Sequence, residues 1–470
     1  MWKEAVLLAL LMLCPSGRGL FYFGSGNTHG SVPCDGGDKG QPLYLTPYIE
    51  AGKVVEGRRL SAVPPLQGLD LVSYCGFLTV NKTYNSNLFF WFFPAKMQSS
   101  TAPLVVWLQG GPGSSSLFGL FMENGPFAVT KNLTLYLRDF AWTSTLSMLY
   151  IDNPVGAGFS FTDDPQGYAS NEDDVARDLF SALMQFFQLF PEFQENDFYI
   201  TGQSYAGKYV PAIAYYIHTL NPTLSLPINL KGIAIGSGFC HPESVLRGYA
   251  SAMYEMGLLD ENQRKYVEEQ SQEALEHLKK REWSQALEVF NRVLTGDNAY
   301  MVNVTGCPDL SNIVQCVEPE EYSYFRKFLA LSEVRRAIHV GNHTFNDGSE
   351  VKKHLEGSSM WSALPWLAEL MNNYKVLLYN GQLDVLLPAS LTERFLMVMN
   401  WKGSQEYRRV ERKIWKILKS DQEVAGYVRQ VGNFHQLIVR GGGHNLPFDQ
   451  PLRAYDMINR FIYEKGWDPY

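Results

Sequence analysis

Sequence motifs for metal and redox sites are missing from this chain. Its 470 residues include six cysteines and nine histidines, all of them scattered. No Cys-x-x-Cys pair and no His-Glu-x-x-His motif occurs among them. Closely spaced ligands of these types mark most zinc and redox sites. We therefore expect no metal site and no cofactor.

Blocks of like charge, internal repeats and low-complexity tracts are also absent from the sequence. The formal net charge is −8 at pH 7, and aromatic residues make up 14% of the chain. An acidic surface repels the phosphates of nucleic acids, and a high aromatic content argues against disorder. These features predict a folded protein without a nucleic-acid partner.

One apolar run, residues 5–14, follows Lys3 and precedes the small residues Pro15, Ser16 and Gly17. The run is too short to span a bilayer. It has the composition of a secretory signal peptide, although a buried N-terminal strand would also fit. No later run is long and apolar enough for a membrane span. We expect a signal peptide at 1–19 and a soluble product of the secretory pathway, either secreted or lysosomal.

Glycosylation sequons agree with a secretory route. An Asn-x-Thr pattern marks an acceptor site for N-linked sugar in proteins that take this route. Four such sequons occur, at Asn81, Asn132, Asn303 and Asn342.

Five cysteines remain outside the predicted signal peptide. Cys307 and Cys316 are close in sequence and flanked by turn residues, which favours a local disulfide. The odd number leaves at least one thiol, unless a second chain pairs with it. A homodimer therefore stays open.

Short apolar segments alternate with helical ones along most of the chain. Such a rhythm is typical of a mostly parallel sheet covered by helices on both faces. Residues 71–80 and 87–93 read as a hairpin. The later strands are expected at 104–108, 147–151, 198–200, 228–235, 375–379 and 435–439, with helices at 175–190 and 205–220.

The rhythm stops at residues 242–294, which are helical in pattern and rich in charge. We expect an α/β core at 65–239 and 331–470, interrupted by a helical cap at 240–330. Residues 20–64 are predicted to be an N-terminal segment that is loosely ordered, because 19–41 are rich in glycine and polar residues.

The most informative stretch is Gly202-Gln203-Ser204-Tyr205-Ala206, between a predicted strand and a predicted helix. A sharp turn of this kind lifts a nucleophilic serine above the sheet and needs small residues two places on either side. The Tyr205 N–H can then point at a developing oxyanion. An ordinary turn with a solvated serine is the alternative interpretation of this motif alone.

A serine nucleophile needs a base and a group that orients the base. His444 and Asp384 each follow a predicted strand, which is where open α/β sheets place their sites. The order Ser204, Asp384, His444 is the α/β-hydrolase order. The three matched positions predict a catalytic triad on an α/β-hydrolase fold.

A glycine-rich loop, residues 110–113, follows the strand at 104–108. Consecutive glycines let backbone N–H groups approach a substrate closely. We expect Gly111 N–H to be the second oxyanion donor, beside Tyr205 N–H. No Gly-Lys-Ser/Thr follows, so a phosphate loop is disfavoured.

Five segments in this order resemble the serine carboxypeptidase family: 107–113, 123–126, 153–160, 202–207 and 443–447. The resemblance implies release of single residues from the C-termini of peptides and proteins. It also implies a set of residues that bind the substrate's terminal carboxylate, namely Trp107, Gln109, Gly110, Glu123 and Gln203.

The sequence departs from the family pattern at the carboxylate-binding set. Family members usually carry Asn at position 109 and Glu at 203, where two facing carboxyls share a proton in acid. Gln203 can donate without first acquiring a proton, so we expect substrate binding to weaken less toward neutral pH. Asn445 stands where many members carry Met, which would alter the pocket for the leaving residue.

Two other functions are compatible with the sequence. One is a scaffold or binding protein that keeps the fold with little catalysis, which the change at Gln203 leaves open. The other is an esterase or acyltransferase that uses the triad on a different acyl group. The amide donors at Gln109 and Gln203 favour a substrate with a free carboxylate.

Overall fold

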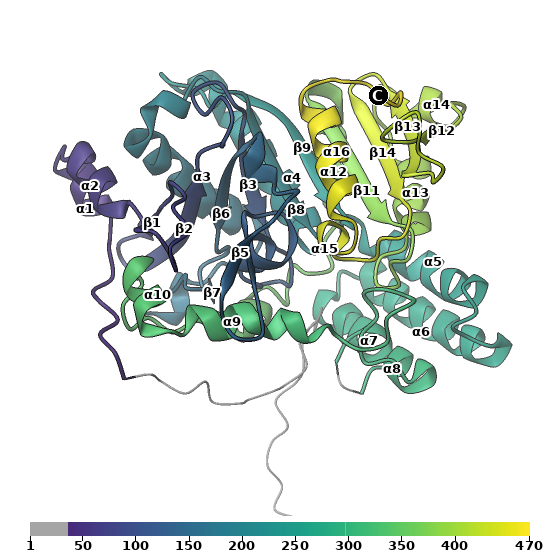
Figure 1. The fold of residues 1–470 in the computed structure, drawn as a ribbon. Helices are drawn as coiled ribbons and strands as arrows, with labels where there is room; N and C mark the ends of the chain where they lie inside the picture. The colour runs from purple at the N-terminus through teal and green to yellow at the C-terminus, as the bar shows by residue number, and fades with distance from the viewer. Residues whose placement is uncertain (1–35, 297) are drawn as a thin grey trace, which may run out of the picture.

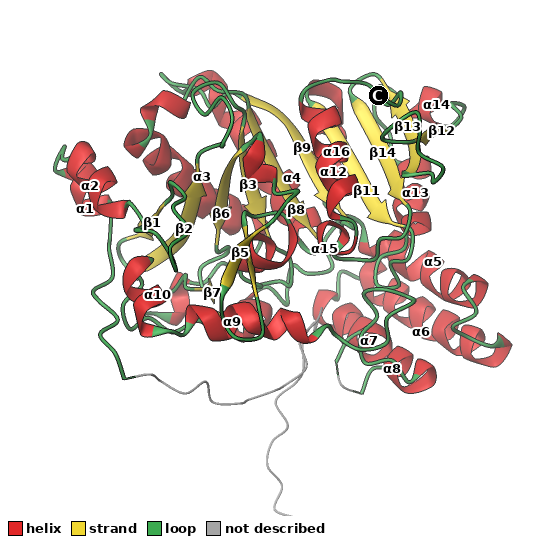
Figure 2. Ribbon diagram, viewed as in Figure 1, coloured by secondary structure: helices red, strands yellow, loops and turns green. Residues whose placement is uncertain are grey.

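The computed structural model describes residues 36–296 and 298–470. A ten-stranded sheet runs through the molecule in the order β1-β2-β6-β3-β8-β9-β11-β14-β13-β12 (Figures 1 and 2). The strands from β6 to β14 in this order are parallel, and both edges are antiparallel. The strands of the sheet are β1 (Tyr74–Asn81), β2 (Ser86–Phe93), β3 (Leu104–Leu108), β6 (Ser147–Ile151), β8 (Phe198–Gln203), β9 (Leu230–Gly236), β11 (Lys375–Gly381), β12 (Lys413–Trp415), β13 (Gly426–Val431) and β14 (Phe434–Val439).

Helices pack on both faces of this sheet. Alternate residues of a strand face opposite sides, and β3 shows this directly: Leu104 and Val106 belong to one buried cluster, Val105 and Trp107 to the other. The main helices of the α/β part are α3 (Glu172–Leu189), α4 (Ala206–Leu220), α12 (Leu364–Asn373), α13 (Ala389–Val398), α15 (Leu446–Asp449) and α16 (Pro451–Ile462). The predicted α/β-hydrolase architecture is thus observed. The eight predicted strands lie within a few residues of their expected bounds, whereas β12 and β13 were not predicted.

The charge-rich region forms a group of helices at one end of the sheet (Figure 1). Its members are α5 (Pro242–Glu255), α6 (Glu261–Lys279), α7 (Trp283–Leu294) and α8 (Tyr300–Thr305). Helix α6 begins with a capping box, in which Asp260 and Gln263 each bond the other's backbone N–H, an arrangement that stabilises a helix start. The chain then returns through α9 (Tyr324–Leu329), α10 (Ser332–Ala337) and α11 (Ser349–His354).

The N-terminal segment is more ordered than its composition indicates. Residues 36–64 were expected to be loose, yet α1 (Thr46–Glu50) and α2 (Val54–Ser61) lie there. Leu45 is fully buried, and its N–H donates a hydrogen bond to Phe77 O of β1 at 2.9 Å. Packing against the sheet fixes this segment. The predicted signal peptide and Cys34 lie outside the described residues.

The smaller strands were not expected from the sequence. They are β4 (Phe127–Val129) with β5 (Leu135–Leu137), and β7 (Ala157–Gly158) with β10 (Asn346–Asp347). Cys307 and Cys316 form a disulfide, and Cys75 and Cys240 are buried thiols. Among the described residues, no helix is both long and apolar enough to cross a membrane.

Candidate active site

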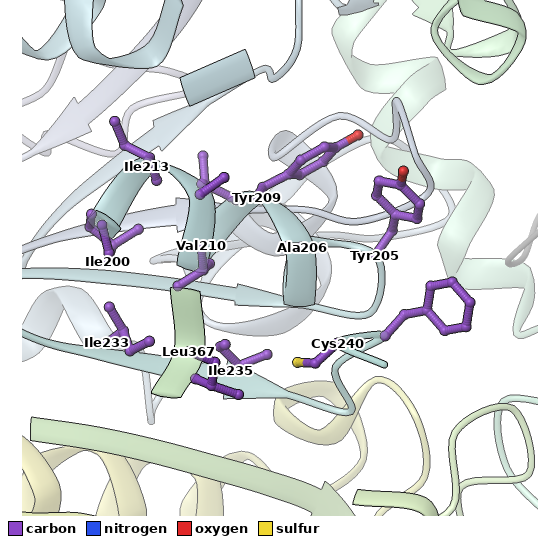
Figure 3. Close-up of a cluster of buried hydrophobic side chains, with 14 of the residues drawn as sticks. Ile200, Tyr205, Ala206, Tyr209, Val210, Ile213, Ile233, Ile235, Cys240 and Leu367 are labelled. Atoms are coloured by element: carbon purple, nitrogen blue, oxygen red, sulfur yellow. The ribbon is translucent and has the colours of Figure 1, made fainter. Parts of the chain in front are cut away.

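Ser204 lies at a tight elbow between β8 and α4. Its φ of +62° is in the left-handed region, which is a strained conformation for serine. A Cβ added at Gly202 would lie 2.7 Å from the Ala206 Cβ and 2.6 Å from Leu108 O. Small residues on both sides of Ser204 are therefore a steric necessity. Figure 3 shows Ile200 of β8 with Ala206 and Val210 of α4 in one cluster of buried side chains, the packing that supports the elbow.

His444 and Asp384 are joined at the ends of two neighbouring strands, β14 and β11. The His444 Nδ1–H donates to Asp384 Oδ2 at 3.0 Å, and Leu387 N–H donates to Asp384 Oδ1 at 3.0 Å. Both side chains are buried. Burial lowers the His444 pKa, but the charge and hydrogen bond of Asp384 outweigh it and raise the pKa above its ordinary value. The pair can therefore hold and stabilise an imidazolium.

The loops that carry this pair are held by the disulfide-bonded segment 307–316. Ser311 O accepts a bond from His444 N at 2.7 Å, and Ile313 N–H donates to Leu383 O at 2.9 Å. Space is tight here too, because a Cβ at Gly443 would lie 2.5 Å from Ser311 O. One segment of the helical insertion thus contacts both the aspartate loop and the histidine loop.

The glycine-rich loop lies against the elbow. A Cβ at Gly110 would lie 2.6 Å from Tyr205 N and 2.8 Å from the Ser204 Cβ. Gly111 has a φ of +114°, which L side chains rarely adopt. Only glycine fits these positions, so the segments carrying the two predicted oxyanion donors, Gly111 and Tyr205, adjoin the nucleophile.

The predicted carboxylate-binding side chains form one hydrogen-bonded network. Trp107 Nε1–H donates to Gln109 Oε1 at 2.8 Å, and Gln109 Nε2 donates to Glu123 Oε1 at 3.0 Å. Gln203 Nε2 lies 3.4 Å from the same Glu123 oxygen. All four side chains are buried. The network is next to the nucleophile, because Gln109, Gly110, Gln203, Ser204 and His444 line one cleft.

Glu123 is a carboxyl group kept neutral by its surroundings. Burial raises its pKa to about 8, although the hydrogen bond from Gln109 and the charges of His444 and Arg138 oppose this. Its Oε2 is buried and has no hydrogen-bond partner among the described residues. Glu123 is placed at the end of a π-helix, Gly119–Glu123, whose Gly119 leaves no room for a Cβ beside the Trp107 indole. π-Helical turns of this kind are frequent at functional sites.

Three further residues belong to this site. Gln203 Nε2 donates to Asn445 Oδ1 at 2.7 Å, and Asn445 Nδ2 donates to the Tyr322 hydroxyl at 2.9 Å. Asp152 fixes the chain after the glycine loop, since its Oδ1 accepts from Ser115 Oγ at 2.5 Å and from Ser116 N at 2.9 Å. The sequence identified Asn445 only as a departure from the family pattern. It carried no signal for Tyr322 or Asp152.

Residues that could hold a metal are not gathered here. Across the described ranges, no group of three or more His, Cys, Asp or Glu side chains is arranged to bind an ion. The cleft instead combines a serine, an imidazole held by a carboxylate, backbone N–H groups and side-chain amides. Such an arrangement is suited to acyl transfer from a substrate that bears a carboxylate.

Residues 64–464 match the model of a peptidase family described as serine carboxypeptidase. The chain therefore belongs to the serine carboxypeptidase family, whose members are hydrolases of the serine type. The fold agrees, because a solved structure of Kex1Δp, a prohormone-processing carboxypeptidase from Saccharomyces cerevisiae, superposes with a TM-score of 0.75. That chain is 22% identical and covers 87% of this one and 96% of its own length.

Individual relatives are similar over nearly their full length. A probable serine carboxypeptidase CPVL from Homo sapiens is 64% identical and covers 100% of this chain and 99% of its own. A venom serine carboxypeptidase from Apis mellifera is 45% identical, with 92% of each chain covered. A vitellogenic carboxypeptidase from Aedes aegypti is 41% identical, with 91% of each covered. The sequences at 379–384 and 456–462 predict a vitellogenic-like member of the family, and these relatives agree with that prediction.

Proposed function

We propose that this protein removes single residues from peptide C-termini through an acyl-enzyme on Ser204, with His444 as base and Asp384 as the group that orients it. The observation that carries this proposal is the placement of three parts in one cleft. Ser204, His444, Gln109 and Gln203 line it, while Asp384 lies behind His444 and Glu123 behind the two glutamines. A nucleophile beside a carboxylate-binding network can act only on the last peptide bond.

The terminal carboxylate of the substrate binds first. Gln109 Nε2, Gln203 Nε2 and Gly110 N–H offer donors without formal charge. Neutral Glu123 can add a donor, because its protonated Oε2 has no other partner among the described residues. This places the scissile carbonyl over Ser204.

His444 Nε2 then takes the proton of the Ser204 hydroxyl as its oxygen attacks the carbonyl carbon. The oxyanion is stabilised by Gly111 N–H and Tyr205 N–H. Imidazolium gives the proton to the leaving amine, and the terminal residue departs with a free amino group. Water, deprotonated by His444, attacks the acyl-enzyme. The bond to Ser204 Oγ breaks, His444 returns the proton to that oxygen, and the shortened peptide leaves with a free carboxylate.

The pH dependence follows from two groups. His444 must be neutral to act as base, so kcat/KM falls as pH drops through its raised pKa. Glu123 must be protonated to donate, so binding of the free acid weakens as pH rises through about 8. Gln203 donates at every pH, which supports binding at neutral pH. Gln203→Glu should therefore move the alkaline limb of the profile toward acid, and an unchanged profile would contradict this account.

The first test compares blocked dipeptides as free acid and as C-terminal amide, from about pH 4 to about pH 8. Cleavage should need Ser204 and favour the free acid. Equal cleavage of acid and amide would contradict recognition of the terminal carboxylate. Absence of cleavage by folded protein would favour the scaffold function, or an esterase or acyltransferase on the same fold.

We also propose that the protein takes the secretory route and ends secreted or lysosomal. Its sequons support this, because Asn132, Asn303 and Asn342 are exposed and Asn81 is half-buried. Endoglycosidase treatment of protein from mammalian cells should lower its apparent mass. No change in mass would count against the route.

A further inference from the structure

A side-chain amide in a carboxylate-binding site has a polarity that a carboxylic acid does not have. One end of Gln203 donates and the other end only accepts. Turned end for end, it would present an oxygen to the substrate carboxylate and repel it. The residue can serve recognition only if its neighbours fix its direction.

Each glutamine of the site has a hydrogen-bonded neighbour that fixes the direction of its amide. At Gln109 it is the Trp107 indole, which can only donate and so holds the Oε1 end of the amide. At Gln203 it is Asn445, whose Oδ1 accepts from Gln203 Nε2 at 2.7 Å.

Asn445 is itself an amide, and its Nδ2 donates to the Tyr322 hydroxyl at 2.9 Å. A hydroxyl can donate as well as accept, so this bond fixes the place of Asn445. A reversed Gln203 is disfavoured by Glu123 Oε1, which would then face a second acceptor.

Tyr322 can hold Asn445 in place because its own ring is packed on two sides. Phe118 meets it edge-on with ring centroids 4.9 Å apart, and Phe448 of α15 does so at 5.0 Å. The side chain is 8% exposed. It belongs to a short 3₁₀ turn, Glu320–Ser323, in the segment that returns from the helical insertion.

The two hydrogens of Gln203 Nε2 are used unequally. The bond to Asn445 is short, whereas the contact with Glu123 Oε1 is 3.4 Å, at the outer limit for a hydrogen bond. The second hydrogen can therefore turn to a substrate carboxylate at little cost while the first stays on Asn445.

We propose that Asn445 and Tyr322 are positioning residues for carboxylate recognition: the chain Tyr322–Asn445–Gln203 holds the donor end of the Gln203 amide toward the substrate. The inference rests on the proposed function, because it takes a terminal carboxylate as the ligand. It links recognition of the substrate's end to a turn outside the α/β sheet. A side chain at 445 that can only pack, such as methionine, would leave the amide free to turn.

The test measures binding rather than turnover, in a Ser204→Ala background. A blocked dipeptide is titrated as free acid and as amide by calorimetry, at one pH near about 5. Asn445→Met and Tyr322→Phe are each made with Gln203 and with Gln203→Glu. A carboxylic acid needs no fixed direction, so each of the two substitutions forms its own double-mutant cycle with Gln203→Glu.

With Gln203 present, Asn445→Met should reduce the preference for free acid over amide about tenfold, and Tyr322→Phe about threefold to fivefold. With Gln203→Glu, both losses should shrink to less than about twofold. Tyr322→Phe keeps its ring contacts, so it remains informative if Asn445→Met fails to fold. Equal losses in both backgrounds, equal losses for acid and amide, or no preference for the free acid in Ser204→Ala itself would overturn the proposal. Failure of the proposed catalysis would appear separately, as absence of Ser204-dependent cleavage by the unsubstituted chain.

Discussion

The cleft has two corners that are built in different ways. The first is the corner that we propose to be catalytic, called the catalytic corner below. There backbone packs on backbone: Gly110 lies on the Ser204 elbow, and Gly443 lies on Ser311 with no room for a Cβ. The second is the proposed recognition corner, where side chains from distant segments meet through hydrogen bonds, as in Gln109–Glu123 and Gln203–Asn445. The first corner is fixed by sterics and tolerates no change. The second can be altered by exchanging one polar side chain for another.

The largest effect should come from the catalytic corner. Asp384→Asn leaves the volume intact but favours the wrong His444 tautomer, so kcat should fall about 10⁴-fold while KM changes little. Steady-state kinetics on a free-acid dipeptide measures both values. If the substitution mainly raises KM, Asp384 acts in substrate binding, and the two corners do not have separate functions.

A methyl group added at Gly110 should disturb the backbone of the same corner. Gly110→Ala would place a Cβ 2.6 Å from Tyr205 N and displace an oxyanion donor, so kcat should fall about 10²- to 10³-fold. Gly357→Ala is the matched control, since nothing lies within 4 Å of its added Cβ. If both variants keep full activity, steric control of the elbow is wrong.

At the recognition corner the expected change is in the pH dependence of stability. Glu123 has a folded pKa of about 8 against an ordinary value near 4.5, so the folded state holds a proton that the unfolded state has lost. The native protein should therefore lose stability as pH rises between these values, by at most about 1.4 kcal/mol per pH unit from this group. Glu123→Gln should remove that slope.

Thermal unfolding of both proteins at several pH values measures this difference. The free energy of unfolding of Glu123→Gln, relative to that of the unsubstituted protein, should rise from about pH 5 to about pH 8. A constant difference across this window would show that Glu123 is ionised throughout, contrary to a neutral recognition corner.

The smallest effect on turnover should come from the segment that contacts both catalytic loops. Cys307→Ser with Cys316→Ser removes the disulfide but keeps the bonds from Ser311 and Ile313, so kcat should fall only about threefold. Cys75→Ser, on the edge strand β1, is the control for loss of a cysteine elsewhere. A loss as large as that of Asp384→Asn would show that the catalytic corner depends on the insertion rather than on the sheet.

The sequence predicted where Ser204, Asp384 and His444 lie better than it predicted the contacts of the amide network, for a physical reason. Ser204, Asp384 and His444 each follow a buried strand, and the strands are continuous apolar runs that periodicity detects. Strand β12 at the edge of the sheet and its neighbour β13 contain exposed and half-buried residues, so they are not continuous apolar runs and were not predicted. Neither were α1 and α2, which owe their order to contacts with the sheet rather than to local signals.

Tyr322 could not be predicted, because its partner Asn445 lies 123 residues further along the chain. Nothing near Tyr322 in the sequence reports that contact. The neutral state of Glu123 was equally hidden, since it results from burial in the folded protein. The assignment of Gln203 to recognition came from motif resemblance, and its short bond to Asn445 only from the fold.

The proposed recognition network consists of amides, an indole, a hydroxyl and a carboxyl whose pKa is raised, and within residues 36–296 and 298–470 no cation is hydrogen-bonded to Gln109 or Gln203. Added salt weakens the attraction between opposite charges, but it has little effect on hydrogen bonds between buried neutral groups and an anion. Affinity for a peptide terminus should therefore change little between dilute buffer and concentrated salt. A protein with this cleft would bind chain ends about equally well in compartments of very different ionic strength.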